Sequence, residues 1–156
     1  TQNVDDLHER AGSRHVLHLH GLITRYLCNL CGAPHAITPT DRRRTRPPLC
    51  PSCGAPIRPG VVWFGEMLPE RILDQAYRSA RRCDVLLIVG TSGVVYPVAH
   101  LPHMAKSAGA HVIEQNLQCD AYQQVADVQL EGRGGILLPQ LVEAVKRLRA
   151  EDAQRA

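Results

Sequence analysis

Two pairs of cysteines constrain the fold of this chain more than any other feature. Cys28 and Cys31 form one C-x-x-C pair, Cys50 and Cys53 form a second, and 18 residues separate the pairs. This spacing is typical of a structural zinc site with four thiolate ligands, because each pair directs two sulfurs to one centre and no coordination position stays open for catalysis. Two disulfides, or four unrelated buried thiols, are the alternatives. A glycine follows each pair, as a tight turn with positive φ favours.

Residues 25–60 around these cysteines are rich in Pro, Gly and Arg and show no sustained periodicity. We therefore expect a small zinc-binding module inserted into a larger domain made of residues 1–24 and 61–156. A zinc ion contributes about 10–16 kcal/mol in such sites, enough to hold a segment with almost no core of its own. The basic run 41–46 lies between the two pairs and could contact nucleic acid or an acidic partner. Since a charged run is usually a solvated loop, we do not expect direct nucleic-acid binding.

From residue 61 onward the chain alternates helical and extended patterns. We expect helices over residues 69–82, 97–108 and 138–150, and strands over residues 85–89, 111–114 and 128–130, after a short helical piece at 5–11. Pro102 predicts a kink or a late start in the middle helix. The strand at 85–89 is apolar throughout, as in a parallel sheet covered on both faces. This alternation predicts βαβ units and an α/β fold.

Composition excludes several classes of protein. The chain is 44% hydrophobic and 21% charged, as globular domains are. Its longest apolar run, 85–89, is far short of the roughly 20 residues that span a bilayer, so we expect no membrane segment. The net charge of +3 does not indicate a polyelectrolyte binder. Paired cysteines that favour a metal indicate a reducing compartment, which we take to be the cytoplasm. The chain opens at Thr1 without a methionine, which is consistent with a missing natural N-terminus.

Small and polar residues follow each of the three expected strands. Gly90-Thr91-Ser92-Gly93 follows the first strand, Asn116 the second, and the glycines at 132, 134 and 135 the third. Open α/β sheets bind ligands at the carboxyl ends of their strands, and small residues let the backbone approach a phosphate or ribose. We therefore expect a nucleotide crevice at this edge. Bare connecting turns and a strand-ending asparagine are the alternatives.

Taken together in chain order, six motifs resemble those of the sirtuins, NAD-dependent protein-lysine deacylases. They are Thr1-Gln2-Asn3-Val4-Asp5, Leu19-His20-Gly21, the two C-x-x-C pairs, Val61-Val62-Trp63-Phe64-Gly65-Glu66, Gly90-Thr91-Ser92-Gly93 and Asn116. The match runs from Thr1 to about Val145. It implies an incomplete Rossmann-like parallel sheet with a small inserted zinc-ribbon module, because the family's first strand and glycine-rich phosphate loop have no counterpart here.

The resemblance implies roles for individual residues. His20 matches the family's catalytic histidine, a general base that acts through the ribose hydroxyls of NAD, and an imidazole titrates in the right range for this task. Without the motif, a packed or solvated histidine is the alternative. The residues matched to cofactor binding are Gln2, Asn3, Val4, Asp5, Gly90, Thr91, Ser92, Asn116, Leu117, Gln118 and Gly134. Those matched to the two edges that hold a substrate peptide as an added strand are Val62, Phe64, Gly65, Glu66, Gly93, Val94 and Val95.

By this resemblance the chain transfers an acyl group from a lysine of a peptide or protein to ADP-ribose, with release of nicotinamide. The acyl group is left open between acetyl, succinyl and malonyl, because the Tyr and Arg that select acidic groups lie upstream of Thr1. We expect the chain alone to bind NAD weakly and turn over little. A zinc-ribbon module that binds nucleic acid or protein, and an inactive sirtuin fragment, are the alternatives. A dehydrogenase is not supported, since the chain has no G-x-G-x-x-G motif.

Overall fold

The computed structural model describes residues 1–155. Two compact units make up the chain: residues 1–75, and a second unit that begins at Ala76. The boundary between them falls within helix α2 (Glu70–Ala80), which lies inside the expected range of 69–82. The predicted division into a zinc module over 25–60 and a larger domain around it stays a prediction.

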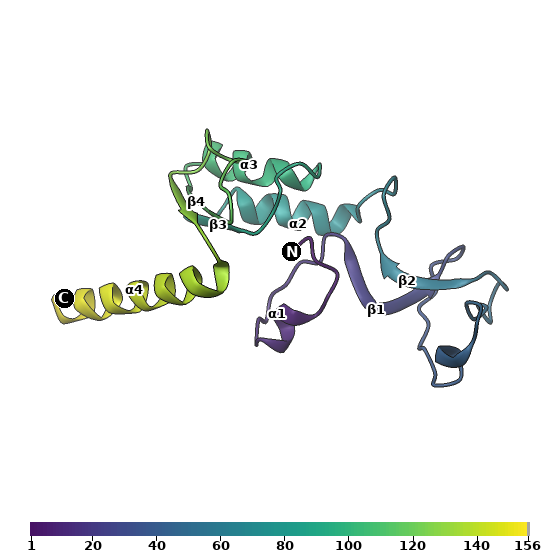
Figure 1. Cartoon of the computed structure of the whole chain (residues 1–156). Helices are drawn as coiled ribbons and strands as arrows, with labels where there is room; N and C mark the ends of the chain where they lie inside the picture. The colour runs from purple at the N-terminus through teal and green to yellow at the C-terminus, as the bar shows by residue number, and fades with distance from the viewer. Residues whose placement is uncertain (156) are drawn as a thin grey trace. The chain divides into compact units, whose positions relative to one another are not determined.

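The first unit contains a two-stranded antiparallel ribbon, β1 (Gly21–Cys28) and β2 (Ile57–Val61) (Figure 1). Gly21 pairs with Val61 at one end and Cys28 with Ile57 at the other, so the first cysteine pair leaves directly from the end of a strand. The sequence did not predict either strand. The register shifts between residues 22 and 26, which breaks the alternation of β1, and β2 contains a proline and a glycine.

Two short helical turns complete this unit. Helix α1 (Leu7–Arg10) lies within the expected range of 5–11, and the 3-10 turn η1 (Asp41–Arg43) falls in the basic run between the cysteine pairs. The side chain of Asp5 accepts a hydrogen bond from the N–H of Leu7 at 3.0 Å, as an acidic residue before a helix is expected to do.

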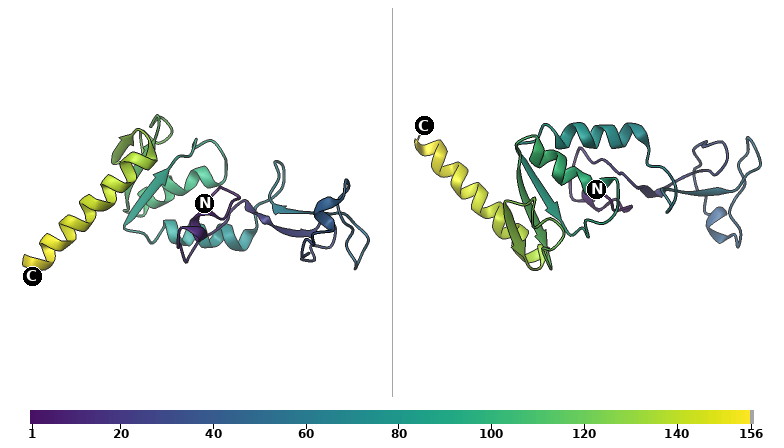
Figure 2. Two further views of the ribbon diagram at one scale, coloured as in Figure 1. Left: turned by 60° about the horizontal axis from the view of Figure 1, so that its bottom comes forward. Right: turned by 90° about the horizontal axis from the view of Figure 1, so that it is seen from above.

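The second unit contains a three-stranded parallel sheet in the order β3-β4-β5. Its strands are β3 (Val85–Val89), β4 (His111–Asn116) and β5 (Val128–Glu131), and Figure 2 shows them side by side. The prediction of an α/β fold with parallel strands is confirmed. Strand β3 matches its expected bounds, whereas β4 extends two residues and β5 one residue beyond theirs.

Two helices of the second unit do not begin at the first residue of their expected ranges, 97–108 and 138–150. Helix α3 (Leu101–Ser107) follows the 3-10 turn η2 (Val98–His100), so Pro102 lies in the first helical turn and the predicted late start is confirmed. Helix α4 (Gly134–Arg155) begins four residues before the expected position. Our prediction of a start at 138 was wrong, since residues 134–137 already belong to α4. Pro139 lies inside the helix, where it lacks the N–H for one backbone hydrogen bond and its ring crowds the carbonyl four residues earlier.

One face of the sheet packs against helices, whereas the opposite face of β3 is open. Ala80 of α2 and Ala105 of α3 are buried together against Leu86. Val85 and Val89 are 54% and 47% exposed, so the expectation of a strand covered on both faces is wrong for residues 1–155. Alternate residues of a strand face opposite sides, and β3 is an edge strand within these residues. None of the helices in the described chain is both long and apolar enough to cross a bilayer.

Candidate functional site

The four cysteines converge on one point in the first unit. Their sulfur atoms all lie within 4.8 Å of one another, with 3.4 Å between Cys28 and Cys53 and 3.7 Å between Cys31 and Cys50. A tetrahedral zinc with bonds of about 2.3 Å places its sulfurs about 3.8 Å apart, so the set has the dimensions of a four-thiolate zinc site. All six cysteines of the chain are free of disulfides, as this assignment requires.

The two cysteine turns have the same backbone geometry. In the first, the N–H of Cys28 donates to Ala33 and the N–H of Gly32 donates back to Cys28. The second turn repeats both bonds with Cys50, Ala55 and Gly54. The two glycines have φ of 69° and 74°, which confirms the expected left-handed position after each pair.

The pKa values of two of the four thiols, Cys28 and Cys53, are shifted in opposite directions. The N–H groups of Cys31 and Leu30 donate to the Cys28 sulfur and lower the pKa of this thiol to about 6 against the effect of burial. The N–H of Ala55 lowers the pKa of Cys53, but the neighbouring Cys28 sulfur and burial outweigh it and raise this pKa to about 12. Four adjacent thiolates therefore need a cation, and zinc binds the deprotonated form. The donor set fits a structural zinc ion.

His20 lies immediately before β1 and is fixed by backbone contacts on both sides. Its Nδ1 lies 3.0 Å from the carbonyl oxygen of Gln2, and its own carbonyl accepts the N–H of Val62 at 2.9 Å. A carbonyl can only accept, so Nδ1 carries the proton and Nε2 keeps a lone pair. The half-buried imidazole thus has the tautomer that a general base needs.

The residue after His20 must be a glycine for steric reasons. A Cβ on Gly21 would lie 2.1 Å from the carbonyl oxygen of Gly60, and Gly21 has a φ of 78°. The backbone of β2 at Gly60 therefore leaves no room for a side chain at the residue after His20. The segment 17–20 is also held by the N-terminal residues, since the amino group of Thr1 donates to Leu17 and the N–H of Leu19 donates to Thr1.

The loop that follows β2 is held by a carboxylate. The two terminal nitrogens of the Arg58 guanidinium, Nη1 and Nη2, donate to Glu66 at 2.5 and 2.8 Å. The N–H of Trp63 donates to the same carboxylate at 3.0 Å. The Arg58 hydrogen bond, followed by the Trp63 N–H, lowers the pKa of Glu66 to about 2. Phe64 is fully exposed beside them. Arg58 was not predicted from the sequence. Its ion pair with Glu66 spans eight residues and depends on the turn between them.

The carboxyl ends of β3, β4 and β5 are joined by hydrogen bonds in the second unit. Gly90, which follows β3, donates its N–H to Gln115 on β4, and Gly132, which follows β5, donates its N–H to Asn116. The amide of Gln115 donates to the carbonyl of Gly132 at 2.7 Å. The three strand ends that the sequence placed at one edge thus form one continuous backbone surface. Gln115 is a further positioning residue, and its side-chain amide near the carboxyl end of β4 was the signal.

The turn after β3 is shaped by Asn116. Its side-chain amide donates to the carbonyl of Thr91 at 2.8 Å, and its side-chain oxygen accepts the N–H of Leu117 at 2.9 Å. A Cβ on Gly90 would meet nothing within 4 Å, so the turn has open space beside it. Small residues beside open space let a phosphate or ribose approach the backbone, and the turn fits one half of a dinucleotide.

The site residues predicted from sequence thus fall into groups, each described within its own unit. The first unit holds the four cysteines, His20 and the cofactor candidates 2–5, together with Val62, Phe64, Gly65 and Glu66. The second holds the candidates 90–95, 116–118 and 134. Gly134 begins α4, where a Cβ would lie 2.8 Å from the side-chain oxygen of Gln115. The role of each residue toward a ligand stays a prediction.

A Rossmann-like parallel sheet, four cysteines with the geometry of a zinc site and a fixed histidine together define a class of α/β proteins with a structural zinc module. Residues 1–97 match the Sir2 family. The chain is 53% identical over 148 residues to NAD-dependent protein deacylase 2 of Pyrobaculum aerophilum, covering 94% of this chain and 58% of that protein. It belongs to the Sir2 family.

Solved structures agree with this assignment. A Sir2 homologue in complex with NAD superimposes with a TM-score of 0.87 at 44% identity, covering 94% of this chain and 57% of that one. Sir2Af2 bound to a myristoylated histone peptide gives a TM-score of 0.83 at 44% identity, covering 96% and 65%. The chain therefore spans somewhat less than two thirds of the length of these relatives.

Proposed function

We propose that this chain is part of an NAD-dependent protein-lysine deacylase. The observation that carries the proposal is the hydrogen bond from His20 Nδ1 to the Gln2 carbonyl, which leaves Nε2 free to take a proton. Membership of the Sir2 family supports it, as do the name of the Pyrobaculum relative and the NAD complex of the solved homologue. NAD, when bound, supplies the ADP-ribose group that receives the acyl group.

In this proposal the residues of the chain bind, orient and move a proton. Nε2 of His20 accepts a proton from a ribose hydroxyl, while Gln2 keeps the ring in one tautomer. Gly90, Thr91 and Ser92 offer the backbone of their turn to the dinucleotide, and Asn116 holds that turn in shape. The remaining cofactor candidates, which we propose as further contacts to NAD, are Asn3, Val4, Asp5, Leu117, Gln118 and Gly134. This is catalysis mainly by positioning.

The proposed substrate is an acylated lysine in an extended peptide. The peptide would add as a strand to backbone groups of Val62, residues 64–66 and residues 93–95. This mode relies on main-chain hydrogen bonds and tolerates many sequences. The Sir2Af2 complex with a myristoylated histone peptide supports an acyl-lysine peptide. We propose acetyl-lysine as the first substrate to test, with succinyl- and malonyl-lysine as alternatives. Free thiols in a zinc-ligand arrangement support a cytoplasmic location.

The experiment is a product analysis. The chain is joined to the part of the Pyrobaculum deacylase that it does not span, and is incubated with NAD and an acetyl-lysine peptide. Mass spectrometry should detect the free lysine peptide, nicotinamide and acetyl-ADP-ribose in equal amounts, and none of them without NAD. Deacetylation without NAD, or NAD cleavage without acyl transfer, would contradict the proposal.

A further inference from the structure

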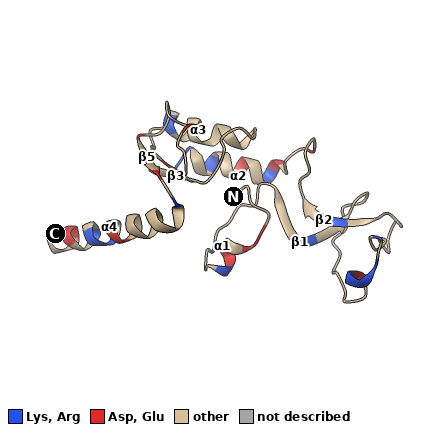
Figure 3. Cartoon of the chain, viewed as in Figure 1, with Lys and Arg blue, Asp and Glu red and all other residues tan. Residues whose placement is uncertain are grey.

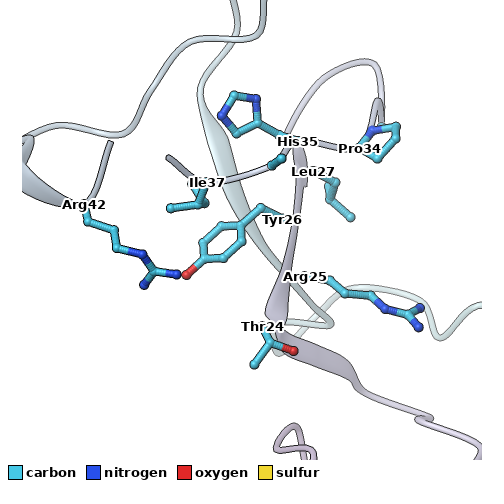
Figure 4. Close-up of a pocket in the computed structure, with 10 residues that line it drawn as sticks. Thr24, Arg25, Tyr26, Leu27, Pro34, His35, Ile37 and Arg42 are labelled. Carbon is cyan, nitrogen blue, oxygen red and sulfur yellow. The ribbon is translucent and has the colours of Figure 1, made fainter. Parts of the chain in front are cut away.

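Two adjoining pockets lie on the zinc-binding module, and neither is lined by a residue assigned to catalysis or cofactor binding. They have volumes of about 480 and 300 Å³. Tyr26, Ile37 and Arg42 line both, so the two form one groove, referred to below as the Tyr26 groove. Figure 4 shows the side chain of Arg42 and the hydroxyl of Tyr26 pointing toward each other.

The groove lies in the most basic part of the chain. Residues 25–60 contain six arginines and one aspartate, a formal charge of +5 in a chain whose total is +3, so the other residues are net acidic. Figure 3 shows this concentration of blue around η1 and the β1–β2 ribbon. Within residues 1–155, no ion pair engages Arg25, Arg42, Arg43 or Arg46. Two of these, Arg25 and Arg42, line the larger pocket, and Arg46 lines the smaller one.

The single acid of the module does not neutralise these arginines. Asp41 accepts hydrogen bonds from the N–H and the hydroxyl of Thr38, at 3.0 and 2.7 Å, and pairs with Arg44 at 3.5 Å. The other paired arginine, Arg58, is bound to Glu66. The groove therefore presents unpaired positive charge that a partner of opposite charge can complete.

The walls between the charges are apolar and stiff. Leu27, Pro34 and Ala36 line the larger pocket, and Pro47, Pro48 and Pro59 line the smaller one. Proline rings fix φ, so these walls lose little freedom when a ligand binds. A ligand that fills the groove must combine apolar groups with negative charges at its rim.

We propose that the Tyr26 groove binds an acidic segment of a partner protein, an extended peptide in which Asp or Glu alternates with apolar side chains. The apolar side chains occupy the two pockets, and the carboxylates meet Arg25, Arg42 and Arg46. A nucleic acid fits less well, because single strands bind by stacking successive bases on several aromatic rings, and Tyr26 is the only Phe, Trp or Tyr in residues 25–60. A phosphate backbone also has no apolar groups to fill the pockets.

This binding does not depend on NAD or on deacylation. It uses residues that no catalytic or cofactor role claims, so a binding assay without NAD tests it apart from the proposed function. The zinc-loaded chain is titrated into a fluorescein-labelled peptide of alternating glutamate and leucine, and anisotropy is measured at low and physiological salt. The same peptide with glutamine in place of glutamate, and a labelled DNA oligonucleotide of equal charge, serve as comparison probes.

Two variants separate charge from shape. The pair Arg42→Gln with Arg46→Gln should weaken binding of the glutamate peptide by roughly fivefold, whereas Arg147→Gln with Arg149→Gln, on the exposed face of α4, should leave it unchanged. Ala36→Trp fills the larger pocket without changing charge and should weaken binding by roughly tenfold, whereas Ala150→Trp should not. Zinc content and circular dichroism verify that each variant is folded.

The expected result is binding that weakens as salt rises, requires the glutamates and falls in both groove variants. Equal affinity for the glutamine peptide would overturn the proposal, as would unchanged affinity in the arginine pair or in Ala36→Trp. Tighter binding of the oligonucleotide than of the peptide would also overturn it, and would identify the groove as a nucleic-acid surface.

Discussion

Gly21 provides the sharpest test of how the backbone positions His20. A Cβ at this residue would lie 2.1 Å from the Gly60 carbonyl oxygen, and the residue has positive φ. Gly21→Ala should therefore lower the free energy of unfolding of the first unit by at least about 3 kcal/mol, from left-handed strain together with strand separation. Urea unfolding of the zinc-loaded chain measures this change.

Gly12→Ala is the matched control, because Gly12 has a φ of 94° but nothing within 4 Å of a Cβ. Its cost should be limited to the strain of about 1–2 kcal/mol. Equal losses in the two variants would show that β1 and β2 do not need close contact at Gly21.

The sequence predicted the candidate site best where the type and spacing of a few residues determine the chemistry. The spacing of the four cysteines was sufficient for the zinc site, since a tetrahedral ion leaves few alternatives. The glycine after each pair was predicted for the same reason. Pairings such as Glu9 with His18, at 2.6 Å, could not be predicted, because they depend on how a loop returns to a helix.

The zinc-binding loops should need the metal ion to stay folded, whereas the parallel sheet should not. Cys31→Ser removes one of four ligands, so we expect loss of bound zinc and loss of hydrogen-exchange protection over residues 28–56, because the loops have little core apart from Cys28, Cys50 and Ile57. Protection in β3 and β4 should persist. Zinc release and hydrogen exchange followed by mass spectrometry measure both effects.

Cys83→Ser is the control for this prediction, since Cys83 lies outside the four-cysteine cluster and its thiol donates to the carbonyl of Ala80. It should keep one zinc per chain. Full zinc occupancy and unchanged protection in Cys31→Ser would contradict a four-thiolate site.

The loop after β2 should be rigid because Glu66 holds it. Glu66→Gln should lower the fluorescence anisotropy of Trp63, the only tryptophan, because the charge-assisted contacts to Arg58 are lost. The pKa of Glu66 is lowered to about 2, so its contribution to stability is present above the ordinary carboxyl value and is lost as pH falls toward 2. The wild-type anisotropy should therefore stay constant between about pH 5 and 8.

Glu70→Gln, at the start of α2, is the control and should leave the anisotropy unchanged. If Glu66→Gln has no effect on Trp63 either, the carboxylate does not order this loop.

At this scale the sequence predicted periodic elements and missed irregular ones. Strand β3 and the late start of α3 followed from an apolar run and a proline. The β1–β2 ribbon was missed because its long register shift and Pro59 remove the alternation that identifies a strand. Helix α4 was expected to begin four residues too late, because its first residues include two glycines, which have low helix propensity.

For the whole molecule, we predict that the 156 residues alone turn over slowly. The chain spans 58% of the Pyrobaculum deacylase, and β3 has an open apolar face with Leu87 41% exposed. A site with fewer positioned groups stabilises the transition state less. Joining the remaining part of that relative should raise NAD-dependent deacetylation by roughly a hundredfold. Equal rates for the two forms would contradict this prediction.

The α/β fold class could be predicted because helical and extended patterns alternate from residue 61 onward, as in βαβ units. The open face of β3 could not be predicted. An apolar run indicates that a strand is most stable when buried, but it does not show whether residues 1–155 bury it. The family followed from motif order, which the match over residues 1–97 confirms.

The central claim is that the imidazole of His20 acts as a general base in NAD-dependent deacylation. The most direct measurement is the deacetylation rate of His20→Ala in the joined protein, beside His15→Ala, which alters an exposed histidine of the same segment. The account predicts a loss of at least about a hundredfold in His20→Ala with NAD still bound, and a change of less than about twofold in His15→Ala. A His20→Ala rate close to the wild-type rate would contradict it.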